Sequence, residues 1–248
     1  MSLDGKTAIV TGAAQGMGFA FAKELTRRGA RVYMCDIQED EVVKAARQLA
    51  NLGPGAVPLV TDVSEEEDVQ AAIDRAVADT GRLDILVNNA AIHPLKGIEE
   101  VSVEEWDRVL AVNLRSCFLF CRGAITQMKK QEFGRIISIA SEAGKNGGTI
   151  CAPHYAASKG AILALTRNLA RAVGSHGITV NAIAPGRIAP AMAGQVSDEE
   201  NQVYIDKSSV KRLGVPEDIA NAVAFLADDR SSFVTGETLN VNGGTLMD

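Results

Sequence analysis

Tyr155 and Lys159, two residues with proton-transfer chemistry, stand four positions apart in a helical stretch of the sequence. On a helix this spacing places both side chains on one face. A free tyrosine has a pKa of about 10, which makes it a poor base at neutral pH. A neighbouring ammonium group stabilises the phenolate and lowers that pKa. The pair is therefore a candidate general acid/base, although the same spacing also occurs by chance on helix surfaces.

Ser141 is the third candidate for the same chemistry. It follows the predicted strand 135–140, at the carboxyl edge where open α/β sheets bind ligands. Its hydroxyl could hydrogen-bond a substrate oxygen, or it could be an ordinary turn residue at a strand end. Ser138 is the competing hydroxyl, but it lies within the strand and is expected to point into the packing.

A glycine-rich turn, with Gly12, Gly16 and Gly18, lies between the first predicted strand and the first helix. These glycines let the backbone turn sharply and approach a pyrophosphate, and the N–H groups of the following helix can bind the phosphates. An ordinary strand–helix turn can show the same glycines. The position between a strand and a helix favours a dinucleotide site.

Asp36 ends the second predicted strand, 18 positions after Gly18. A carboxylate there accepts hydrogen bonds from the adenosine ribose hydroxyls. It also repels a 2′-phosphate, because like charges held this close cost several kcal/mol. Gln15 also favours NAD, since an arginine at that position would favour the 2′-phosphate of NADP. A surface acid at a strand end is the alternative, but after these glycines the sequence predicts NAD rather than NADP.

Short β-branched runs alternate with amphipathic stretches along the whole chain, which is typical of a parallel sheet with crossover helices on both faces. No linker or composition shift divides the sequence, so residues 1–248 are expected to form a single α/β domain: a Rossmann-type, doubly wound parallel sheet of seven strands. The predicted strands are 7–11, 31–35, 56–60, 83–87, 135–140, 178–184 and 238–241. The predicted helices are 16–28, 39–52, 64–80, 102–131, 155–174 and 216–227.

Three capping-box patterns, starting at Ser64, Ser102 and Ser197, mark expected helix starts. The last of them lies in a long stretch of weak pattern, at about residues 187–211. Because most connections in compact domains are short, this segment is a candidate substrate lid.

The composition excludes several classes of protein. The chain of 248 residues has 25 basic and 31 acidic side chains, a formal net charge of −6, and no basic stretch, which argues against a nucleic-acid partner. No apolar run approaches the roughly 20 residues of a membrane helix. The first residues show no signal segment, so we expect a cytoplasmic protein without a membrane partner.

The four cysteines, Cys35, Cys117, Cys121 and Cys151, form no CxxC pair and no cluster with histidine. Cys117 and Cys121 could face the same way on a helix, as zinc ligands sometimes do, but no His, Asp or Glu nearby completes a site. Buried thiols are therefore expected, with no disulfide and no metal.

Together these motifs resemble the short-chain dehydrogenase/reductase family nearly from end to end. The residues that carry the resemblance are Thr11–Gly18, Asp62-Val63, Asn88-Asn89-Ala90, Asn113, Ser141, Tyr155–Lys159, Pro185-Gly186, Arg212–Ala220 and Thr235–Gly244.

The resemblance implies a role for each matching residue. Tyr155 would be the general acid/base, Ser141 would orient the substrate oxygen, and Lys159 would hold the nicotinamide ribose and lower the pKa of Tyr155. Asn113 would position a water in a proton relay. The cofactor-binding residues implied by the turn, the acid and the family motifs are Gly12, Gln15, Gly16, Met17, Gly18, Asp36, Asp62, Val63, Asn89, Ala90, Tyr155, Lys159, Pro185, Gly186 and Ile188.

Two positions depart from the family pattern. Ala91 replaces a glycine, which tightens the backbone without removing a functional group. Pro190 replaces a threonine that touches the nicotinamide carboxamide, which puts that contact and the closure of the lid in doubt.

The expected reaction is reversible hydride transfer between NAD(H) and a secondary alcohol or ketone, with a small, fairly neutral molecule as substrate. His93, Ser141, Cys151 and Tyr155 are the expected substrate contacts, and His93 and His154 could equally be solvent-facing loop residues. The family also implies a homotetramer built through the long helices.

Three other functions compete with this one. An NADPH-dependent 3-oxoacyl-(acyl-carrier-protein) reductase also fits the overall pattern, although the negative net charge disfavours an acidic carrier protein. A non-catalytic dinucleotide sensor would show a broken catalytic set. A Rossmann-type transferase would leave Tyr155 and Lys159 without a purpose.

Overall fold

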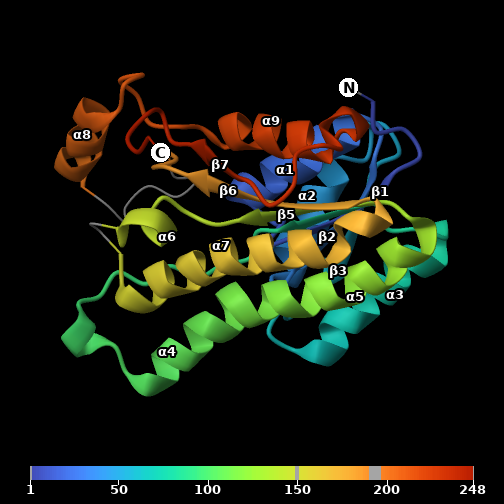
Figure 1. Cartoon of the computed structure of the whole chain (residues 1–248), viewed down its shortest axis with the longest axis horizontal. Coiled ribbons are helices and arrows are strands. Elements are labelled where there is room, and N and C mark those ends of the chain that lie inside the picture. Colours follow the sequence, from blue (N-terminus) through green and yellow to red (C-terminus); the bar gives the residue numbers. More distant parts are fainter. Residues whose placement is uncertain (1, 149–150, 190–196, 248) are drawn as a thin grey trace.

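The chain folds around one parallel sheet. The structure, a computed structural model, describes residues 2–148, 151–189 and 197–247. Within them, seven strands pair in the order β3-β2-β1-β4-β5-β6-β7 (Figure 1). All neighbouring strands are parallel, as predicted. The strands are β1 (Thr7–Thr11), β2 (Arg31–Asp36), β3 (Ala56–Val60), β4 (Ile85–Asn88), β5 (Gly134–Ile139), β6 (Ile178–Pro185) and β7 (Thr238–Val241).

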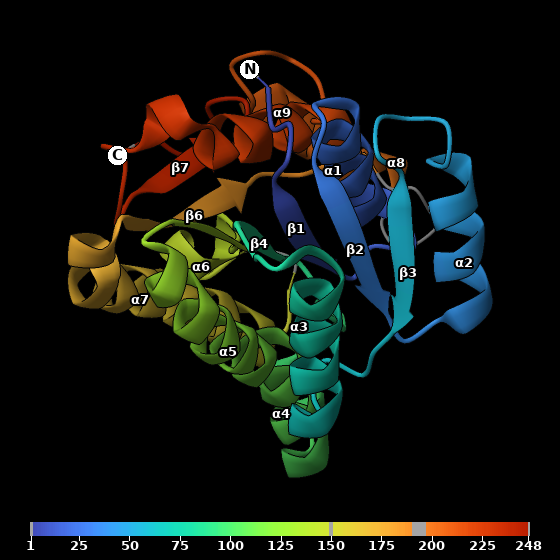
Figure 2. The same cartoon turned by 90° about the vertical axis from the view of Figure 1, so that its right-hand side faces the viewer.

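Helices cover both faces of the sheet, so the expected doubly wound architecture is confirmed (Figure 2). One face carries α1 (Gly16–Arg27), α2 (Glu39–Gln48) and α9 (Pro216–Ala227). The other carries α3 (Glu66–Thr80), α4 (Val103–Leu110), α5 (Ser116–Gln131) and α7 (Pro153–Val173). The short helix α6 (Ala143–Asn146) and the helix α8 (Asp198–Lys207) both lie near one end of the molecule (Figure 1).

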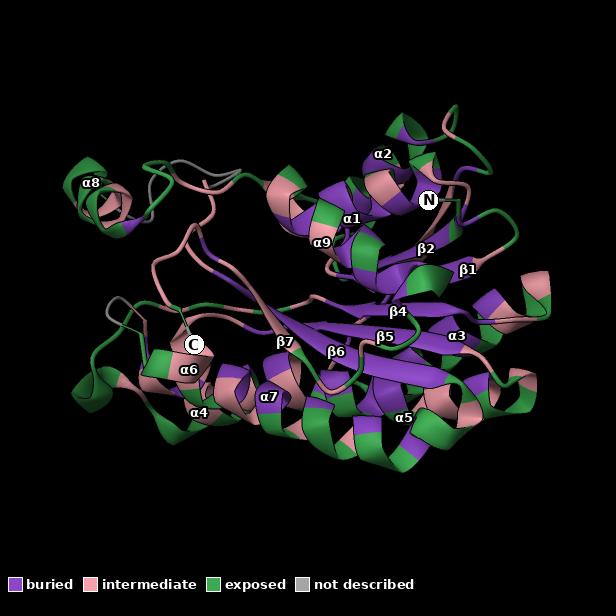
Figure 3. Cartoon of the chain, turned by 45° about the horizontal axis from the view of Figure 1, so that its top comes forward, coloured by how far each residue is buried: buried purple, intermediate pink, exposed green. Residues whose placement is uncertain are grey.

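The inner strands β1, β2, β4, β5 and β6 are buried on both faces, as crossover helices require, whereas the edge strands β3 and β7 are partly exposed (Figure 3). Successive side chains point to opposite faces. Ile9 packs in the core on the side of α3 and α5, whereas its neighbours Ala8 and Val10 pack on the side of α1 and α9. In β4, Leu86 and its neighbours divide in the same way. The strand order reverses between β1 and β4, so the loops that follow these two strands flank the crevice where such sheets bind ligands.

Local chemistry shifts one predicted helix start. The capping box at Ser64 is wrong: α3 begins at Glu66, and its N-cap residue Glu65 makes no side-chain cap. The Ser64 hydroxyl instead donates to Asp62 at 2.7 Å, because that acid lies close enough to compete for it. The boxes at Ser102 and Ser197 do cap their helices, each accepting from a backbone N–H three residues on.

The long helix predicted over 102–131 is interrupted. Residues Ala111–Arg115 form a π-helical turn between α4 and α5, a feature that often marks functional positions. By length and hydropathy alone, Val103–Gln131 is one helix that could cross a membrane. Its most apolar window is 44% buried against the rest of the chain, and core helices of soluble proteins pass the same test.

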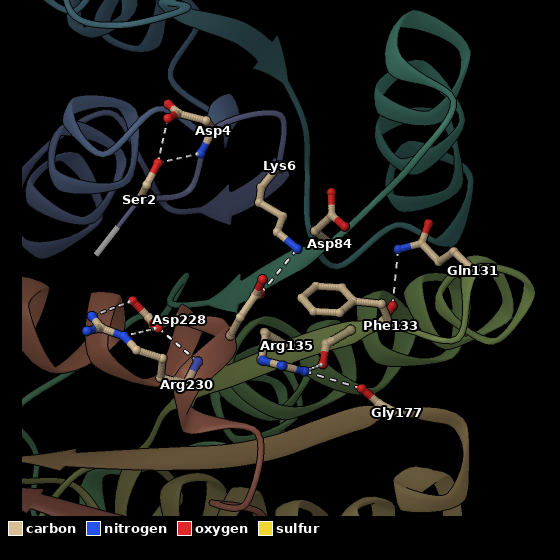
Figure 4. A network of polar contacts seen from close by, with 12 residues as sticks. Ser2, Asp4, Lys6, Asp84, Gln131, Phe133, Arg135, Gly177, Asp228 and Arg230 are labelled. Carbon is tan, nitrogen blue, oxygen red and sulfur yellow. Dashed lines mark hydrogen bonds and ion pairs between the residues drawn. The ribbon is translucent and has the colours of Figure 1, made fainter.

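A network of charged and aromatic side chains lies near the start of β5 (Figure 4). The ammonium of Lys6 lies 3.6 Å from the ring centroid of Phe133, and the guanidinium carbon of Arg135 lies 4.3 Å from it. Lys6 also pairs with Asp229 at 3.2 Å, and Arg135 donates to the carbonyl of Gly177. The Phe133 ring thus binds two cations that join β1, β5 and the segment after α9.

We predict that Phe133→Leu lowers the free energy of unfolding by about 1–2 kcal/mol, because it removes both cation–π contacts. Urea denaturation of the wild type, Phe133→Leu, Lys6→Met and the double variant measures this. The coupling between the two substitutions isolates the Lys6–Phe133 contact. Strictly additive losses would show that the Lys6–Phe133 contact contributes nothing to stability.

Candidate active site

The turn after β1 is held closely against α1 and the segment after β4. A Cβ on Gly18 would lie 2.0 Å from the carbonyl oxygen of Gly12, and a Cβ on Gly12 would lie 2.9 Å from the Cα of Ala90. Gly12 and Gly16 both have positive φ, at 63° and 57°. A Cβ on Gly16 would meet nothing within 4 Å, so the outer side of this turn is open.

The first turn of α1 has free N–H groups. Its N-cap residue Gln15 makes no side-chain cap, and no acidic residue stands in the first turn. Acidic residues do stand in the first turns of α2, α3, α4, α8 and α9, whereas α5, α6 and α7 have none, as in α1. The open glycine turn and this uncapped, uncompensated helix start fit a pyrophosphate.

Asp36 holds the turn from the neighbouring strand. It is buried at the end of β2, where one carboxylate oxygen accepts from the backbone N–H of Ala14 at 3.0 Å and the other from Gln38 at 3.1 Å. Each carboxylate oxygen has a second lone pair. The carboxylate is therefore fixed beside the glycine turn and can accept further hydrogen bonds, as ribose hydroxyls require.

The remaining predicted cofactor residues divide into two groups. Asn89 donates to the carbonyls of Thr11 and Gly12, at 2.9 and 3.1 Å, and the N–H of Ala90 donates to the Thr11 hydroxyl. Asp62 is partly exposed, and its pKa is lowered mainly by the hydrogen bonds from Ser64. Val63 is almost fully buried in the core. Asn89 and Ala90 therefore lie directly at the glycine turn, whereas Asp62 and Val63 lie after β3.

Ser141, Tyr155 and Lys159 come together at the carboxyl end of β5, as the sequence predicts. Ser141 and Tyr155 line the same cavity, and Ser141 lowers the pKa of Tyr155. The ammonium of Lys159 lies 5.6 Å from the centre of the Tyr155 ring and donates to the carbonyl of Ile139 at 2.7 Å. The residue before α7 is Ala152, and Pro153 starts the helix, which places both Tyr155 and Lys159 within its first two turns.

Burial dominates the electrostatics of this group. It lowers the pKa of Lys159 to about 8, so the ammonium stays mostly protonated at neutral pH. Burial also raises the pKa of Tyr155, and Ser141 only partly opposes this. Desolvation of the phenol is the largest of these effects on the pKa of Tyr155. That Lys159 lowers this pKa stays a prediction.

Asn113 lies in the π-helical turn and is buried. Its side-chain oxygen accepts from the N–H of Ile92 at 2.8 Å, and its amide donates to the Ile92 carbonyl and to the Ser158 hydroxyl. Asn113 thus connects the loop after β4 to the catalytic helix. Its predicted role in a proton relay stays a prediction.

A cavity of about 320 Å³ opens beside Ser141 and Tyr155. Eight of the residues singled out in the sequence line it, together with residues of α6 and α8. The lining residues are Met17, His93, Ala140, Ser141, Glu142, Ala143, Asn146, Gly148, Cys151, Tyr155, Pro185, Gly186, Arg187, Ile188, Asn201 and Tyr204.

The structure places His93, Cys151 and His154 in three different environments. The His93 ring stacks on Tyr155 with centroids 4.0 Å apart, and it is also exposed to solvent at the cavity edge. Although His93 is exposed on one side, partial desolvation of its ring and the charges of Lys159 and Arg187 lower its pKa. Cys151 lines the cavity and is only partly buried, unlike the other three cysteines. His154 is neither solvent-facing nor in the cavity: it is fully buried and contacts Glu105.

Sequence reasoning missed four polar residues of the cavity: Glu142, Arg187, Asn201 and Tyr204. Tyr204 and Thr245 donate to the same Glu142 oxygen at 2.7 and 2.8 Å, and burial raises the pKa of Tyr204 to about 12. The capping box at Ser197 already predicts α8, and the spacing of Asn201 and Tyr204 places both on one face of it. Asn201 and Tyr204 could have been predicted as neighbours from that spacing in the sequence.

The described part of the predicted lid contributes α8 to the cavity, and Pro190 lies outside the described residues. Ser138 points into the packing as expected, where it contacts Asn88 and Cys117. Among residues 2–148, 151–189 and 197–247, no group of three His, Cys, Asp or Glu side chains is arranged to hold a metal ion.

Known proteins match this chain over its whole length. A family model described as enoyl-(acyl carrier protein) reductase matches residues 12–245. The 3-oxoacyl-(acyl-carrier-protein) reductase of Escherichia coli K12 is 39% identical, and that of Vibrio cholerae is 38% identical, each alignment covering 100% of both chains.

Solved structures agree with these matches. A 3-oxoacyl-(acyl-carrier-protein) reductase from Brucella melitensis superposes with a TM-score of 0.93 at 39% identity, covering 100% of this chain and 93% of the other. A second structure from the same organism, with bound NAD, has a TM-score of 0.92 at 38% identity over the same shares. The chain therefore belongs to the short-chain dehydrogenase/reductase family, as an oxidoreductase that acts on an alcohol CH–OH group or the corresponding ketone.

Proposed function

We propose that the protein interconverts a 3-oxoacyl compound and its 3-hydroxyacyl product, with NAD(H) as hydride carrier. The observation that carries the proposal is that Ser141 and Tyr155 line one cavity next to the open glycine turn, with Lys159 buried beside Tyr155. When bound, NAD(H) gives or takes the hydride, and its oxidised form brings a positive charge to the site.

Tyr155 and Ser141 handle the substrate oxygen. In reduction, the Tyr155 hydroxyl gives its proton to the oxygen of the ketone as that oxygen gains negative charge. Ser141 donates a hydrogen bond to the same oxygen and fixes its position relative to Tyr155. In oxidation, the phenolate of Tyr155 removes the hydroxyl proton of the alcohol.

Lys159 supports the proton transfer without contacting the substrate oxygen. Its charge is held in place by the Ile139 carbonyl and is buried, so its effect on nearby groups is only weakly screened. We propose that it stabilises the Tyr155 phenolate and binds the nicotinamide ribose. Asn113 would link this group to solvent through a water.

Asp36 supports NAD as the cofactor. Its carboxylate is fixed by Ala14 and Gln38, so it cannot swing away from a 2′-phosphate without breaking both hydrogen bonds. The neighbouring Gln15 offers no positive charge in compensation.

The form of the acyl substrate has two candidates. The names of the relatives favour a thioester on an acyl carrier protein, and they support this candidate better than the general alcohol and ketone substrates expected from the sequence. The second candidate is a free small molecule. A cavity of about 320 Å³ has room for one, and the net charge of −6 disfavours an acidic carrier protein. We further propose a cytoplasmic homotetramer, without a nucleic-acid or membrane partner.

We predict that Tyr155→Phe lowers turnover by roughly 10²–10⁴-fold or more while NADH still binds, because the ring remains and only the transferable proton is lost. NADH oxidation with acetoacetyl thioesters and a panel of small ketones measures turnover, and fluorescence titration measures NADH binding. Near-normal activity of the variant would refute the assignment. A wild type that binds NADH but reduces none of these ketones would favour the non-catalytic sensor.

Asp36→Asn keeps the shape of the side chain and removes its charge. We predict that the ratio of kcat/KM for NADH to that for NADPH falls on the order of 100-fold, because the repulsion of the 2′-phosphate is lost. Asp40→Ser, which removes a nearby exposed charge at the start of α2, serves as the matched control. A wild type that prefers NADPH would contradict this account of Asp36.

A further inference from the structure

Arg187 brings a positive charge into the cavity from the residue directly after Gly186. It lines the cavity and is partly buried. Its Nε donates to the side-chain oxygen of Asn201, on α8, at 2.7 Å. This bond fixes the plane of the guanidinium and leaves its two terminal nitrogens for other partners.

Those terminal nitrogens have no carboxylate partner within the described residues, where no ion pair involves Arg187. Glu142 lines the same cavity, but its carboxylate accepts from Tyr204 and Thr245 on one oxygen and from Asn146 on the other. Glu142 keeps its negative charge in this cavity, but it is not paired with Arg187. A partly buried guanidinium without a paired carboxylate is costly, and a planar carboxylate matches its two terminal nitrogens.

The side chain of Arg187 shares its cavity with the reacting group. Arg187, His93, Ser141 and Tyr155 all line the cavity of about 320 Å³, and the ring centroids of His93 and Tyr155 lie 4.0 Å apart. The charges of Lys159 and Arg187 both lower the pKa of His93, which agrees with this placement. A small molecule with its ketone at Tyr155 and Ser141 can therefore place a second group near Arg187.

We infer that Arg187 binds the carboxylate of the substrate, and that the protein acts on a small free 3-oxo acid and its 3-hydroxy acid. The inference rests on the proposed hydride-transfer reaction and selects the free molecule over the carrier-bound thioester. Asn201 is the positioning residue for Arg187. Gly186 lets α8 lie close to the segment that carries Arg187, since a Cβ on Gly186 would lie 2.1 Å from the hydroxyl oxygen of Tyr204 on α8.

The test compares acetoacetate with its neutral methyl ester in the wild type, Arg187→Gln and Asn201→Ala. We expect Arg187→Gln to lower kcat/KM for acetoacetate by about 100-fold, as the loss of a charge-assisted hydrogen-bonded pair predicts. The methyl ester should change by only a few-fold. Asn201→Ala should give the same selective loss, but smaller. Lys207→Gln, which removes one exposed charge from the same helix α8, is the control.

Three results would overturn the inference. Equal losses for the acid and the ester would mean that Arg187 is structural or binds a neutral carbonyl. Weaker NADH binding by Arg187→Gln, in a fluorescence titration, would assign Arg187 to the cofactor phosphates. Reduction of a carrier-protein thioester by the wild type with far higher kcat/KM than acetoacetate would exclude the free acid.

A second experiment distinguishes failure of the proposed hydride transfer from failure of the carboxylate site at Arg187. If no ketone is reduced, calorimetry of acetoacetate with the wild type and NAD⁺ still tests Arg187, because a ketone and the oxidised cofactor cannot react. Binding that Arg187→Gln abolishes supports the carboxylate site even then, and absence of binding in the wild type refutes it.

Discussion

Asn89 fastens the loop after β4 to the turn after β1, at the point where the strand order reverses. Its side-chain amide donates to the carbonyls of Thr11 and Gly12, and its backbone N–H donates to the Thr11 hydroxyl. These bonds satisfy backbone groups that a sharp turn would otherwise leave without partners. They also fix both walls of the crevice between β1 and β4, against which the cofactor is proposed to lie. The position of the Tyr155 group relative to that cofactor depends on this join.

The second constraint is a buried cation. Lys159 keeps its charge inside the protein because its ammonium donates a hydrogen bond to the strand-end carbonyl of Ile139, and the cost of burial appears as a pKa of about 8. Asn113 holds the loop that carries Ile92 and His93 against α7. The polar groups of the site are therefore tied to β5, α7 and the loop after β4. This arrangement is suited to a reaction in which two reacting groups must be aligned before a proton moves.

The sequence was sufficient for features that depend on local spacing or on strand ends. The glycines at 12, 16 and 18 lie after a strand and before a helix, and Tyr155 and Lys159 share a helix face, so their positions followed from the predicted elements. Ser64 was misread because the nearby Asp62 competes for its hydroxyl. The polar group of Glu142, Arg187, Tyr204 and Thr245 was missed because its members are brought together only by the packing of α8 and the C-terminal segment onto the end of β6.

The π-helical turn at Ala111–Arg115 has a consequence for the surface of the long helical segment. A π turn contains one residue more than an α-helical turn, and each residue advances a helix by about 100°. The apolar stripe of α4 is thus rotated around the axis relative to that of α5, which packs Cys117, Phe120 and Ala124 against the sheet. One length of helix can in this way serve two differently oriented neighbours. In evolutionary terms, a single inserted codon would be enough to create such a joint, and a single deletion would realign both stripes and withdraw Asn113 from the loop.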